Sequence, residues 1–385
     1  MNPIHVMLVF GTRPEAIKMA PVVYALENRP EFKLTSVVTG QHREMLNSLL
    51  ELFKIKPDCH LDIMQKNQTL SDITTRVLTG LDKYLDELRP DVLLVQGDTT
   101  TAFTAGLAAF YHKIPVGHVE AGLRTGCMYD PFPEEMNRCL LTKIAELQFP
   151  PTSRAKENLL AEGTDPKRIY LTGNTVTDAL QYISAELPAG VPENIVKIEP
   201  GRRMLLIETH RRENLGDPMR NICRALKRIA ADFPDTELVF SVHPNPKVRE
   251  VIMPMMEGLE RVHLLEPMDY PDLVRLQRGA YLILTDSGGI QEEAPAFGVP
   301  AIVLRRTTER PEGIESGNAI LAGTDENNVY NEAARLLTDA GDYEKMSHAA
   351  NPYGDGLAGK RIAQAILHYF GRSDRPDEFT PGAEP

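Results

Sequence analysis

The sequence predicts an α/β protein of two domains, each with a parallel β-sheet that is covered by helices on both faces. Short apolar segments alternate with segments of helical periodicity, and the alternation stops near Pro188, Pro192 and Pro200 before it starts again. Continuous apolar strands are typical of parallel sheets buried on both faces. The length of 385 residues also exceeds what one hydrophobic core usually supports. We therefore predict two Rossmann-like domains, residues 1–173 and 174–357.

In the first half, apolar segments of strand length are followed by segments with helical features. Thr12 can cap the first helix, and Pro14 suits its first position because a helix start leaves that N–H unpaired. The polar stretch 55–70 is expected to be a loop. The expected strands are residues 5–10, 35–38, 91–95, 115–119, 147–149 and 169–171. The expected helices are residues 14–28, one after Arg43 that ends near residue 53, residues 71–88, one that ends at residue 111, and one that opens at Glu134.

The second half repeats this pattern after a helix expected at residues 174–189. Strands are expected at residues 204–207, 238–242, 262–265, 282–284 and 301–304. Asp286, Ser287, Gly288 and Gly289 interrupt the fourth of these segments before a helix expected at residues 290–297. Glycines let backbone N–H groups approach an anion, and a helix N-terminus favours negative charge. The stretch is a candidate phosphate site with Glu293 placed to accept from a ribose; the alternative is an ordinary turn with a serine cap.

Composition narrows the classes of partner and compartment. The net charge of −12 argues against general nucleic-acid binding and against an anionic membrane surface, so an anionic ligand needs a local group of cations. The four cysteines form no C-x-x-C pair, which indicates free thiols in a reducing compartment. The apolar run at residues 6–10 is too short for a signal or membrane segment. These features predict a cytoplasmic protein.

Unusual polar residues fall where the predicted strands end. Ligands of open parallel sheets bind beyond the carboxyl ends of the strands. If the two halves face each other, these ends line one cleft, which would hold a phosphate-bearing ligand against three carboxylates (Asp98, Glu120 and Glu134) and one imidazole (His210). The residues at strand ends are Arg13, Gln41, Asp98, Glu120, His210, His243, Ser287 and Arg310.

Several common catalytic signatures are missing from the sequence. No G-x-G-x-x-G follows the first strand, and there is no Walker loop, zinc-ligand spacing or nucleophile elbow. Acid–base chemistry by carboxylates, without a metal or redox cofactor, is the remaining interpretation.

Eight motifs, in order along the chain, resemble those of the bacterial non-hydrolysing UDP-N-acetylglucosamine 2-epimerases. The resemblance runs from about residue 4 to about residue 370 and leaves only the tail outside it. The motifs are Gly11-Thr-Arg-Pro-Glu-Ala-Ile-Lys18, Gly97-Asp-Thr-Thr-Thr101, Gly117-His-Val-Glu-Ala-Gly-Leu-Arg124, Pro133-Glu-Glu135, His210-Arg-Arg-Glu-Asn214, Thr285-Asp-Ser-Gly-Gly-Ile-Gln-Glu-Glu-Ala-Pro295, Thr307-Thr-Glu-Arg-Pro311 and Asn351-Pro-Tyr-Gly-Asp-Gly356.

This resemblance implies a GT-B-like fold with the site between the domains and a last helix, after Gly356, that returns to the first domain with residues 358–385. It implies reversible conversion of UDP-GlcNAc to UDP-ManNAc for cell-surface polysaccharide, by elimination of UDP to a 2-acetamidoglucal and re-addition. No NAD or other cofactor is implied, and the family suggests a homodimer.

Residue roles follow from the same resemblance. Asp98, Glu120 and Glu134 would transfer protons, in an order that the sequence leaves open, and one of them would benefit from a raised pKa. His210 would support the departing diphosphate or shuttle a proton. The substrate contacts would be Arg13, Lys18, Met268, Leu273, Ser287, Gly288, Gly289, Glu293 and Arg310, with residues 268–273 near uracil.

The sequence departs from the family pattern in a few places. Leu273 stands where some relatives have Phe, and Glu208 stands before Thr209 and His210 where small or apolar residues are usual. Family members also bind UDP-GlcNAc as an activator at a second pocket, for which Gln41, Arg43 and His243 are candidates. Glu44 and Asn67 differ from the Gln and Arg of some relatives in that pocket.

Three other functions compete with epimerisation. A GT-B glycosyltransferase shares the fold but usually has a basic or apolar patch for its acceptor, and none is evident in the sequence. A hydrolysing 2-epimerase would release free ManNAc. A non-catalytic UDP-sugar sensor would have no reason to keep all three carboxylates.

Overall fold

The computed structural model describes residues 2–27, 29–40, 43–63, 65 and 68–383. The chain forms two compact units: unit 1 contains Met1–Ala179 and Gly354–Pro385, and unit 2 contains Leu180–Tyr353. Unit 2 is therefore one continuous segment, whereas unit 1 is completed by the C-terminal part of the chain.

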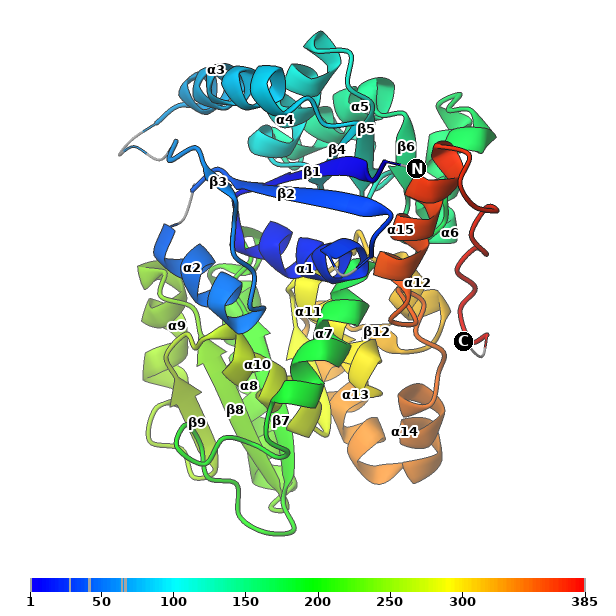
Figure 1. Ribbon diagram of the computed structural model, residues 1–385. Helices are drawn as coiled ribbons and strands as arrows, with labels where there is room; N and C mark the ends of the chain where they lie inside the picture. Colours follow the sequence, from blue (N-terminus) through cyan, green and yellow to red (C-terminus); the bar gives the residue numbers. More distant parts are fainter. Residues whose placement is uncertain (1, 28, 41–42, 64, 66–67, 384–385) are drawn as a thin grey trace. The chain divides into compact units, whose positions relative to one another are not determined.

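Unit 1 is built on a parallel six-stranded sheet with the order β3-β2-β1-β4-β5-β6 (Figure 1). The short edge strand β3 lies in the stretch that was expected to be a loop. The strand expected at residues 169–171 is wrong, because only an isolated bridge between Gln148 and Ile169 forms there. The strands are β1 (Ile4–Phe10), β2 (Phe32–Val38), β3 (Cys59–His60), β4 (Val92–Gln96), β5 (Val116–Val119) and β6 (Leu147–Phe149).

Helices cover both faces of this sheet, as continuous apolar strands require. Figure 1 shows α3, α4 and α5 on one face and α1, α2 and α15 on the other. Close packing joins α15 to α1, since a Cβ added at Gly359 would lie 2.6 Å from the Pro21 carbonyl oxygen. The helices are α1 (Arg13–Glu27), α2 (Arg43–Leu52), α3 (Leu70–Leu88), α4 (Thr100–Tyr111), α5 (Glu134–Ile144), α6 (Ser153–Ala161) and α15 (Ala358–Tyr369), with a 3-10 turn, η1 (Pro166–Arg168). Helix α7 (Thr175–Glu186) runs across the boundary with unit 2.

Unit 2 has a second parallel six-stranded sheet, with the order β12-β11-β10-β7-β8-β9. The edge strand β12 was not predicted. The strands are β7 (Arg203–Thr209), β8 (Thr236–Val242), β9 (Val262–Leu265), β10 (Leu282–Thr285), β11 (Ala301–Val303) and β12 (Ala319–Leu321).

Two apolar clusters lie on the two faces of the unit 2 sheet. One joins the sheet to α8 (Asp217–Asp232), α9 (Pro246–Met256) and α13 (Glu326–Thr338), and the other joins it to α10 (Tyr270–Gly279) and α11 (Gly288–Glu293). The helix after β10 changes to a 3-10 turn, η3 (Ala294–Phe297), where Pro295 has no N–H to donate. The remaining elements are α12 (Pro311–Glu315), α14 (Ala340–Ser347) and the 3-10 turn η2 (Arg212–Asn214).

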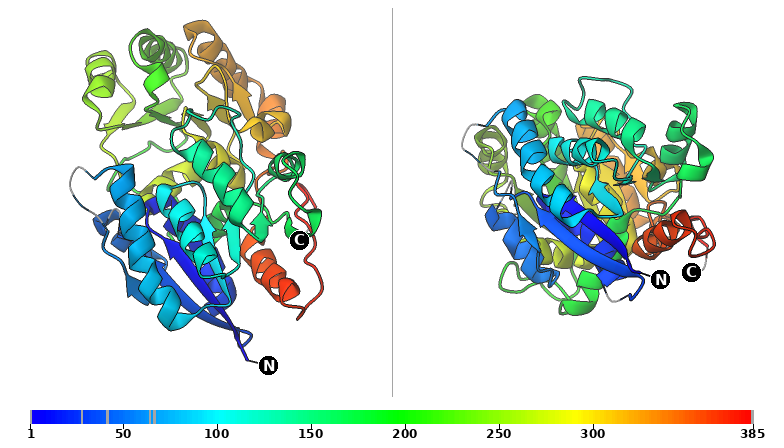
Figure 2. Two further views of the ribbon diagram at one scale, coloured as in Figure 1. Left: turned by 90° about the horizontal axis from the view of Figure 1, so that it is seen from above. Right: turned by 45° about the horizontal axis from the view of Figure 1, so that its top comes forward.

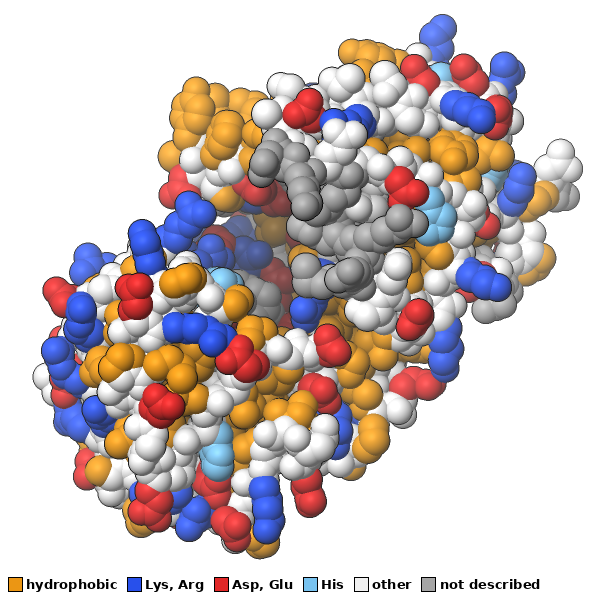
Figure 3. Space-filling view, turned by 90° about the vertical axis from the view of Figure 1, so that its left-hand side faces the viewer, with side chains coloured by type: hydrophobic (Ala, Val, Ile, Leu, Met, Phe, Trp, Pro, Cys, Tyr) orange, Lys and Arg blue, Asp and Glu red, His pale blue; other side chains and the backbone are white. Residues whose placement is uncertain are grey.

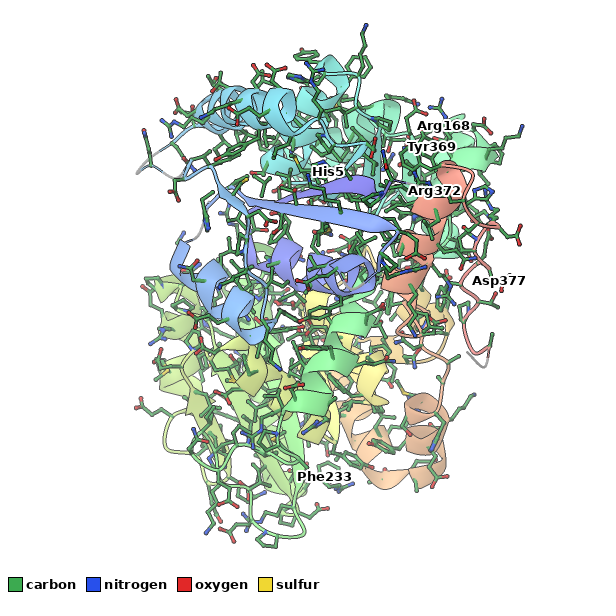
Figure 4. The ribbon with its side chains drawn as sticks, in the orientation of Figure 1. His5, Arg168, Phe233, Tyr369, Arg372 and Asp377 are labelled. Atoms are coloured by element: carbon green, nitrogen blue, oxygen red, sulfur yellow. The ribbon has the colours of Figure 1, made fainter. Side chains whose placement is uncertain are left out.

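The C-terminal tail is docked on unit 1. Phe379 is 3% exposed, and its N–H donates to the Leu171 carbonyl at 2.9 Å. Arg372 Nη1 donates to the Asn2 carbonyl at 2.8 Å, so the segment that follows α15 contacts the N-terminal part of the chain. Figure 2 shows this segment running along unit 1. Figure 4 shows Arg372 on this segment, beyond the end of α15. The tail therefore completes the surface of unit 1.

Numbered within each unit, the strands of both sheets follow the same order, 3-2-1-4-5-6. In such sheets the connections leave in opposite directions at the first and fourth strands, and ligands bind beyond the carboxyl ends at this switch point. The switch point lies between β1 and β4 in unit 1 and between β7 and β10 in unit 2. Four of the predicted site residues follow the strands at these two places: Arg13, Asp98, His210 and Ser287.

Acidic and basic side chains are interspersed over the face that Figure 3 shows. Among the described residues, no helix is both long and apolar enough to cross a membrane.

Candidate functional site

A buried glutamate joins the carboxyl ends of β1 and β4. Glu15 Oε2 accepts hydrogen bonds from the N–H groups of Gly11 and Thr12 at 2.7 Å, and Oε1 accepts from Thr99 Oγ1 at 2.5 Å. Thr12 caps α1 as predicted, accepting from the Glu15 N–H at 3.4 Å. Burial raises the pKa of Glu15 against the effect of these hydrogen bonds. Glu15 was not among the predicted site residues, although the spacing Thr12-x-x-Glu15 of a capping box could have indicated it.

Arg13 and Lys18 both lie on α1, and Lys18 forms an ion pair with Glu120. The two paired side chains are only 13% and 10% exposed. Glu120 directly follows β5 and has a φ of +66°, a conformation that costs energy for a residue with a Cβ. Its N–H donates to the Phe149 carbonyl at 3.1 Å. Unit 1 thus brings one predicted catalytic carboxylate and one predicted substrate contact together.

The second predicted carboxylate, Asp98, follows β4 and pairs with an arginine of α5. Arg138 donates to the Asp98 carboxylate, and Asn137 Nδ2 donates to the Asp98 carbonyl at 2.9 Å. Arg138 also contacts Glu135 at 3.1 Å. Arg138 and Asn137 were not predicted as site residues; their place on the helix that opens at Glu134 was the available signal.

Glu134 and Glu135 begin α5 and differ in their surroundings. Glu134, the third predicted carboxylate, is half-buried. Glu135 is buried, and its Oε1 accepts from the N–H groups of Thr125 and Gly126 at 3.0 Å. Glu135 therefore fixes the loop before α5, which leaves Glu134 as the candidate for proton transfer.

A buried histidine supports the loop that carries Asp98. His118 of β5 donates from Nε2 to the Gly97 carbonyl at 2.7 Å, which assigns the proton to Nε2. Its Nδ1 has no hydrogen-bond partner within the described part of the chain. Burial lowers the pKa of His118 to about 4, and the charge of Arg124 acts in the same direction. His118 is therefore neutral in the folded protein at ordinary pH.

In unit 2, Asp286 organises the switch point. This fully buried residue follows β10 and accepts from Thr209 Oγ1 at 2.5 Å and Asn214 Nδ2 at 2.7 Å. The N–H groups of His210 and Arg211 also donate to its carboxylate, each at 3.0 Å. The sequence marked Asp286 only as a residue that interrupts a strand; the structure shows that it holds the loop that carries His210.

The predicted catalytic imidazole lies between a glutamate and a second histidine. His210 Nδ1 is 2.6 Å from Glu208 Oε1, and the ring stacks on His243 with centroids 5.3 Å apart. The hydrogen bond to Glu208 raises the pKa of His210, against the effect of burial. Burial lowers the pKa of His243, and the neighbouring charge of His210 lowers it further. His243, predicted for a second pocket, thus contacts the predicted catalytic residue of its own unit.

Glu208, His210 and Asp286 are close enough to hold a metal ion, with one ligand atom from each within 4.8 Å of the others. However, Asp286 already accepts hydrogen bonds from two side chains and two N–H groups, and Nδ1 of His210 is bonded to Glu208. A metal would have to displace these bonds. We therefore interpret the group as a hydrogen-bond network.

The glycine turn after β10 lies among arginine side chains. Ser287 precedes α11, and Gly288 and Gly289 are its first residues. A Cβ added at Gly288 would lie 3.4 Å from Glu309 Oε1, 3.6 Å from Arg211 Nη2 and 3.7 Å from Arg310 Cζ. These distances are ordinary van der Waals contacts, and the two arginines supply the local cations that an anionic ligand requires. Both arginines are ion-paired, Arg211 with Glu309 and Arg310 with Glu292.

The predicted ribose contact, Glu293, links α11 to α10. Its oxygens accept from Tyr270 Oη at 3.1 Å and from Gln277 Nε2 at 2.6 Å. A carboxylate oxygen has a second lone pair, so a contact with a ribose remains a prediction. Met268 and Leu273 are partly buried beside and on α10, and their contact with uracil also remains a prediction.

Two residues of the predicted second pocket cannot be placed. Gln41 lies outside the described residues, and Arg43 begins α2 without a described side chain.

Two units with one strand order and polar residues at both switch points place the chain in the GT-B-like class of α/β proteins. A solved glycotransferase of kitacinnamycin, 14% identical, covers 96% of this chain and 99% of its own with a TM-score of 0.64, which shows the shared fold alone. The predicted fold class is confirmed.

The family is narrower than the fold. Residues 24–367 match the family described as UDP-N-acetylglucosamine 2-epimerase. The UDP-N-acetylglucosamine 2-epimerase of Bacillus subtilis is 51% identical over 99% of this chain and 100% of its own length. The crystal structure of UDP-GlcNAc 2-epimerase from Neisseria meningitidis bound to UDP-GlcNAc is 43% identical, covers 95% of this chain and 100% of its own, and has a TM-score of 0.85. The chain belongs to the UDP-N-acetylglucosamine 2-epimerase family, as its motifs indicated.

Proposed function

We propose that this chain is a non-hydrolysing epimerase that interconverts UDP-N-acetylglucosamine and UDP-N-acetylmannosamine. The family supports the substrate, since the Neisseria meningitidis relative is bound to UDP-GlcNAc. The main support for the proposal is that each switch point holds groups suited to one part of the reaction. Ion-paired carboxylates (Asp98 and Glu120) lie in unit 1, and an imidazole with arginines around a glycine turn lies in unit 2.

The proposed reaction needs both sets of groups. In the first step a carboxylate takes the proton from C2 of the sugar, the C1–O bond breaks, and UDP leaves with the bonding electrons to give a 2-acetamidoglucal. In the second step a UDP phosphate oxygen adds to C1 and a proton is delivered to the opposite face of C2. Two acid–base groups are required, one for each face, and the candidates remain Asp98, Glu120 and Glu134.

Each unit has its own proposed contacts with the substrate. The arginines and glycine turn of unit 2 would hold the diphosphate through charge-assisted hydrogen bonds, and Glu293 would hold the ribose. His210, on its loop held by Asp286, would stabilise the negative charge of the departing diphosphate. Arg13 and Lys18 would bind the substrate from unit 1.

Proton NMR of the purified protein with UDP-GlcNAc in D2O tests this function. We expect UDP-ManNAc signals and deuterium at C2, because C2–H cleavage is obligatory in the proposed route. Asp98→Asn should lower the rate about 100-fold or more, the range for an acid–base group. Asp82→Asn, at an exposed carboxylate of α3 that contacts His112, serves as the matched control and should leave the rate unchanged.

Other products would favour the competing functions. Free ManNAc together with UDP would identify a hydrolysing epimerase. Binding of UDP-GlcNAc without any change in its spectrum would favour a sensor or a glycosyltransferase.

We also propose a cytoplasmic homodimer that supplies a cell-surface polysaccharide. All four cysteines are free thiols, which suits a reducing compartment. Exposed Phe110 and Tyr111 at the end of α4 and exposed Leu140 on the adjacent α5 offer apolar area for self-association. Light scattering after size exclusion tests the dimer, and a monomer at every concentration would contradict it.

A further inference from the structure

Glu208 and His210 are two residues apart at the end of β7, a spacing that puts side chains on one side of a strand. Glu208 Oε1 lies 2.6 Å from His210 Nδ1, and Thr285 Oγ1 donates to Glu208 Oε2 at 3.3 Å. The carboxylate is thus held from the neighbouring strand β10 while it contacts the imidazole. A carboxylate repels an anionic diphosphate, so we do not expect Glu208 to bind the diphosphate directly. The group that Glu208 contacts is His210.

The charged groups around His210 come from several elements. Asp286, after β10, has Oδ1 3.6 Å from Nδ1, but its oxygens are bonded to the loop. Arg211 is the neighbouring cation, and His243 stacks on the ring from the end of β8. Arg249 of α9 acts on His243 and is itself bonded to Glu266 at 2.9 Å. Glu208 Oε1, at 2.6 Å, is therefore closer to Nδ1 than the Asp286 carboxylate, at 3.6 Å.

We propose that Glu208 is a positioning residue that holds His210 by its Nδ1–H, so that Nε2 is the nitrogen offered to the diphosphate and the imidazole stays protonated as UDP departs. This inference rests on the proposed function and extends it to a residue with no contact to the substrate. The imidazolium donates a hydrogen bond from Nε2 to the phosphate oxygen that gains charge, and no proton has to leave the ring.

Partial burial makes this contact effective. The side chains of Glu208 and His210 are 16% and 31% exposed, so water screens their attraction less than at the open surface. The hydrogen bond from Glu208 raises the pKa of His210, whereas burial lowers the pKa of His243. Of the two stacked rings, His210 is thus the more readily protonated.

The direction of the change in the pKa of His210 determines which pH values the experiment compares. A raised pKa keeps His210 protonated to higher pH in the wild type than in Glu208→Gln, because a neutral amide stabilises the imidazolium less. Below both pKa values the two proteins have the same charge on His210, and above them the variant loses it. We expect kcat of Glu208→Gln to be within about twofold of wild type at pH 6 and about tenfold lower at pH 8, with KM little changed.

The titration of His210 is measured directly by NMR of protein with 15N-labelled histidine. The signal is assigned by its loss in His210→Gln. We expect His210 to titrate at lower pH in Glu208→Gln than in wild type. This titration needs no substrate, so it separates the proposal from the proposed function. In the activity assay, we expect the double variant to be no slower than His210→Gln alone.

The sequence offers a matched control pair in the same sheet. Glu237 Oε2 lies 2.6 Å from His263 Nε2, away from the switch point. Glu237→Gln removes a glutamate–histidine bond of the same length and should leave the pH dependence of kcat unchanged.

Each outcome decides the proposal. A lower titration of His210 in Glu208→Gln with a pH-dependent loss of kcat supports it. An unshifted titration overturns it, as does a loss of kcat that is equal at pH 6 and pH 8. If the titration shifts but neither the wild type nor any variant epimerises UDP-GlcNAc, the contact between Glu208 and His210 is supported and the proposed function is contradicted.

Discussion

The two switch points share a strand order but are held together in different ways. In unit 1 the bridging carboxylate, Glu15, belongs to the helix after the first strand and reaches Thr99 after the fourth. In unit 2 the bridging carboxylate, Asp286, follows the fourth strand and reaches back to Thr209 at the end of the first. In both units the loops after the first and fourth strands are joined, but the joining carboxylate follows the first strand in unit 1 and the fourth strand in unit 2.

This difference separates what topology determines from what side chains determine. The order of the strands brings the two loops together in both units. It does not determine which loop supplies the acceptor, because a carboxylate on either side can accept from the threonine hydroxyl of the other loop. The polar environment is therefore a property of each sequence.

The histidines of the two units, His118 and His210, also differ in the hydrogen bonding of their rings. Within the described part of the chain, the buried Nδ1 of His118 in unit 1 has no hydrogen-bond partner, and burial lowers the pKa of this histidine to about 4. His210 of unit 2 has an acceptor for Nδ1 in Glu208, and its pKa is raised. One histidine is a neutral structural donor, and the other is suited to carry charge beside a ligand.

The largest effect is expected from Asp286→Ala. The substitution leaves the donors of Thr209, Asn214 and two N–H groups without their acceptor, which should destabilise unit 2 by about 3–5 kcal/mol. Circular dichroism follows unfolding, since the sequence has no Trp for fluorescence. Hydrogen exchange of peptides from β7 and β10 assigns the loss to unit 2.

The control for this variant is Asp217→Ala. Asp217 is 92% exposed and pairs with Arg220 at 3.0 Å, so its removal should change stability by less than about 1 kcal/mol. Equal effects of the two substitutions would show that Asp286 does not organise its switch point.

A second prediction concerns acid and His118. The pKa of His118 is 6.5 in the unfolded chain and about 4 in the folded one, so the unfolded state binds the extra proton between these values. Stability is thus present above pH 6.5 and is lost as the pH falls towards 4, by about 3 kcal/mol in total. His118→Gln should show a shallower loss of stability over this range in urea unfolding followed at several pH values.

The slope, rather than the absolute stability, is the readout, because glutamine also changes the packing. His348→Gln, at an exposed histidine, is the control and should keep the slope of the wild type. An unchanged slope in His118→Gln would mean that the buried ring does not stay neutral.

The smallest effect is expected at Glu15. Glu15→Ala removes the acceptor of two N–H groups and should destabilise unit 1 by about 2 kcal/mol. Glu15→Gln keeps an acceptor for them and can donate to Thr99 Oγ1, so its stability should be within about 1 kcal/mol of wild type at pH 7.

The pH dependence of stability shows whether the charge of Glu15 matters beyond its hydrogen bonds. The folded pKa of Glu15 is raised, so the wild type is favoured at low pH and loses that stability as the pH rises through the folded pKa. Unfolding at pH 5 and pH 8 should show Glu15→Gln gaining relative to wild type at the higher pH. A constant difference would contradict a raised pKa.

The sequence predicts the central part of each sheet well because buried parallel strands are continuously apolar. The segment expected at residues 262–265 forms β9 with the same bounds. The edge strands β3 and β12 were missed, because two- or three-residue strands with one neighbour carry no periodicity. The apolar segment at residues 169–171 was expected to be a strand. It runs beside β6, where the Tyr170 N–H donates to the Gln148 carbonyl at 2.9 Å, but it forms only an isolated bridge.

At the site, the sequence located the loops but not the bonds within them. Asp98, Glu120 and His210 could be selected because they follow predicted strands. Their partners Arg138, Lys18 and Glu208 depend on packing between distant segments or on side-chain direction, which spacing alone does not specify. Lys18 was predicted as a substrate contact, and its pairing with Glu120 appears only in three dimensions.

The docking of α15 and the tail on unit 1 has a consequence for synthesis of the chain. Unit 2 is complete once Tyr353 has left the ribosome, because every residue from Leu180 onward has then been made. Unit 1 begins first but lacks α15, which packs against α1, until the last segment emerges. The unit that is started first is therefore completed after unit 2, and during elongation the part of α1 that packs against α15 lacks this partner.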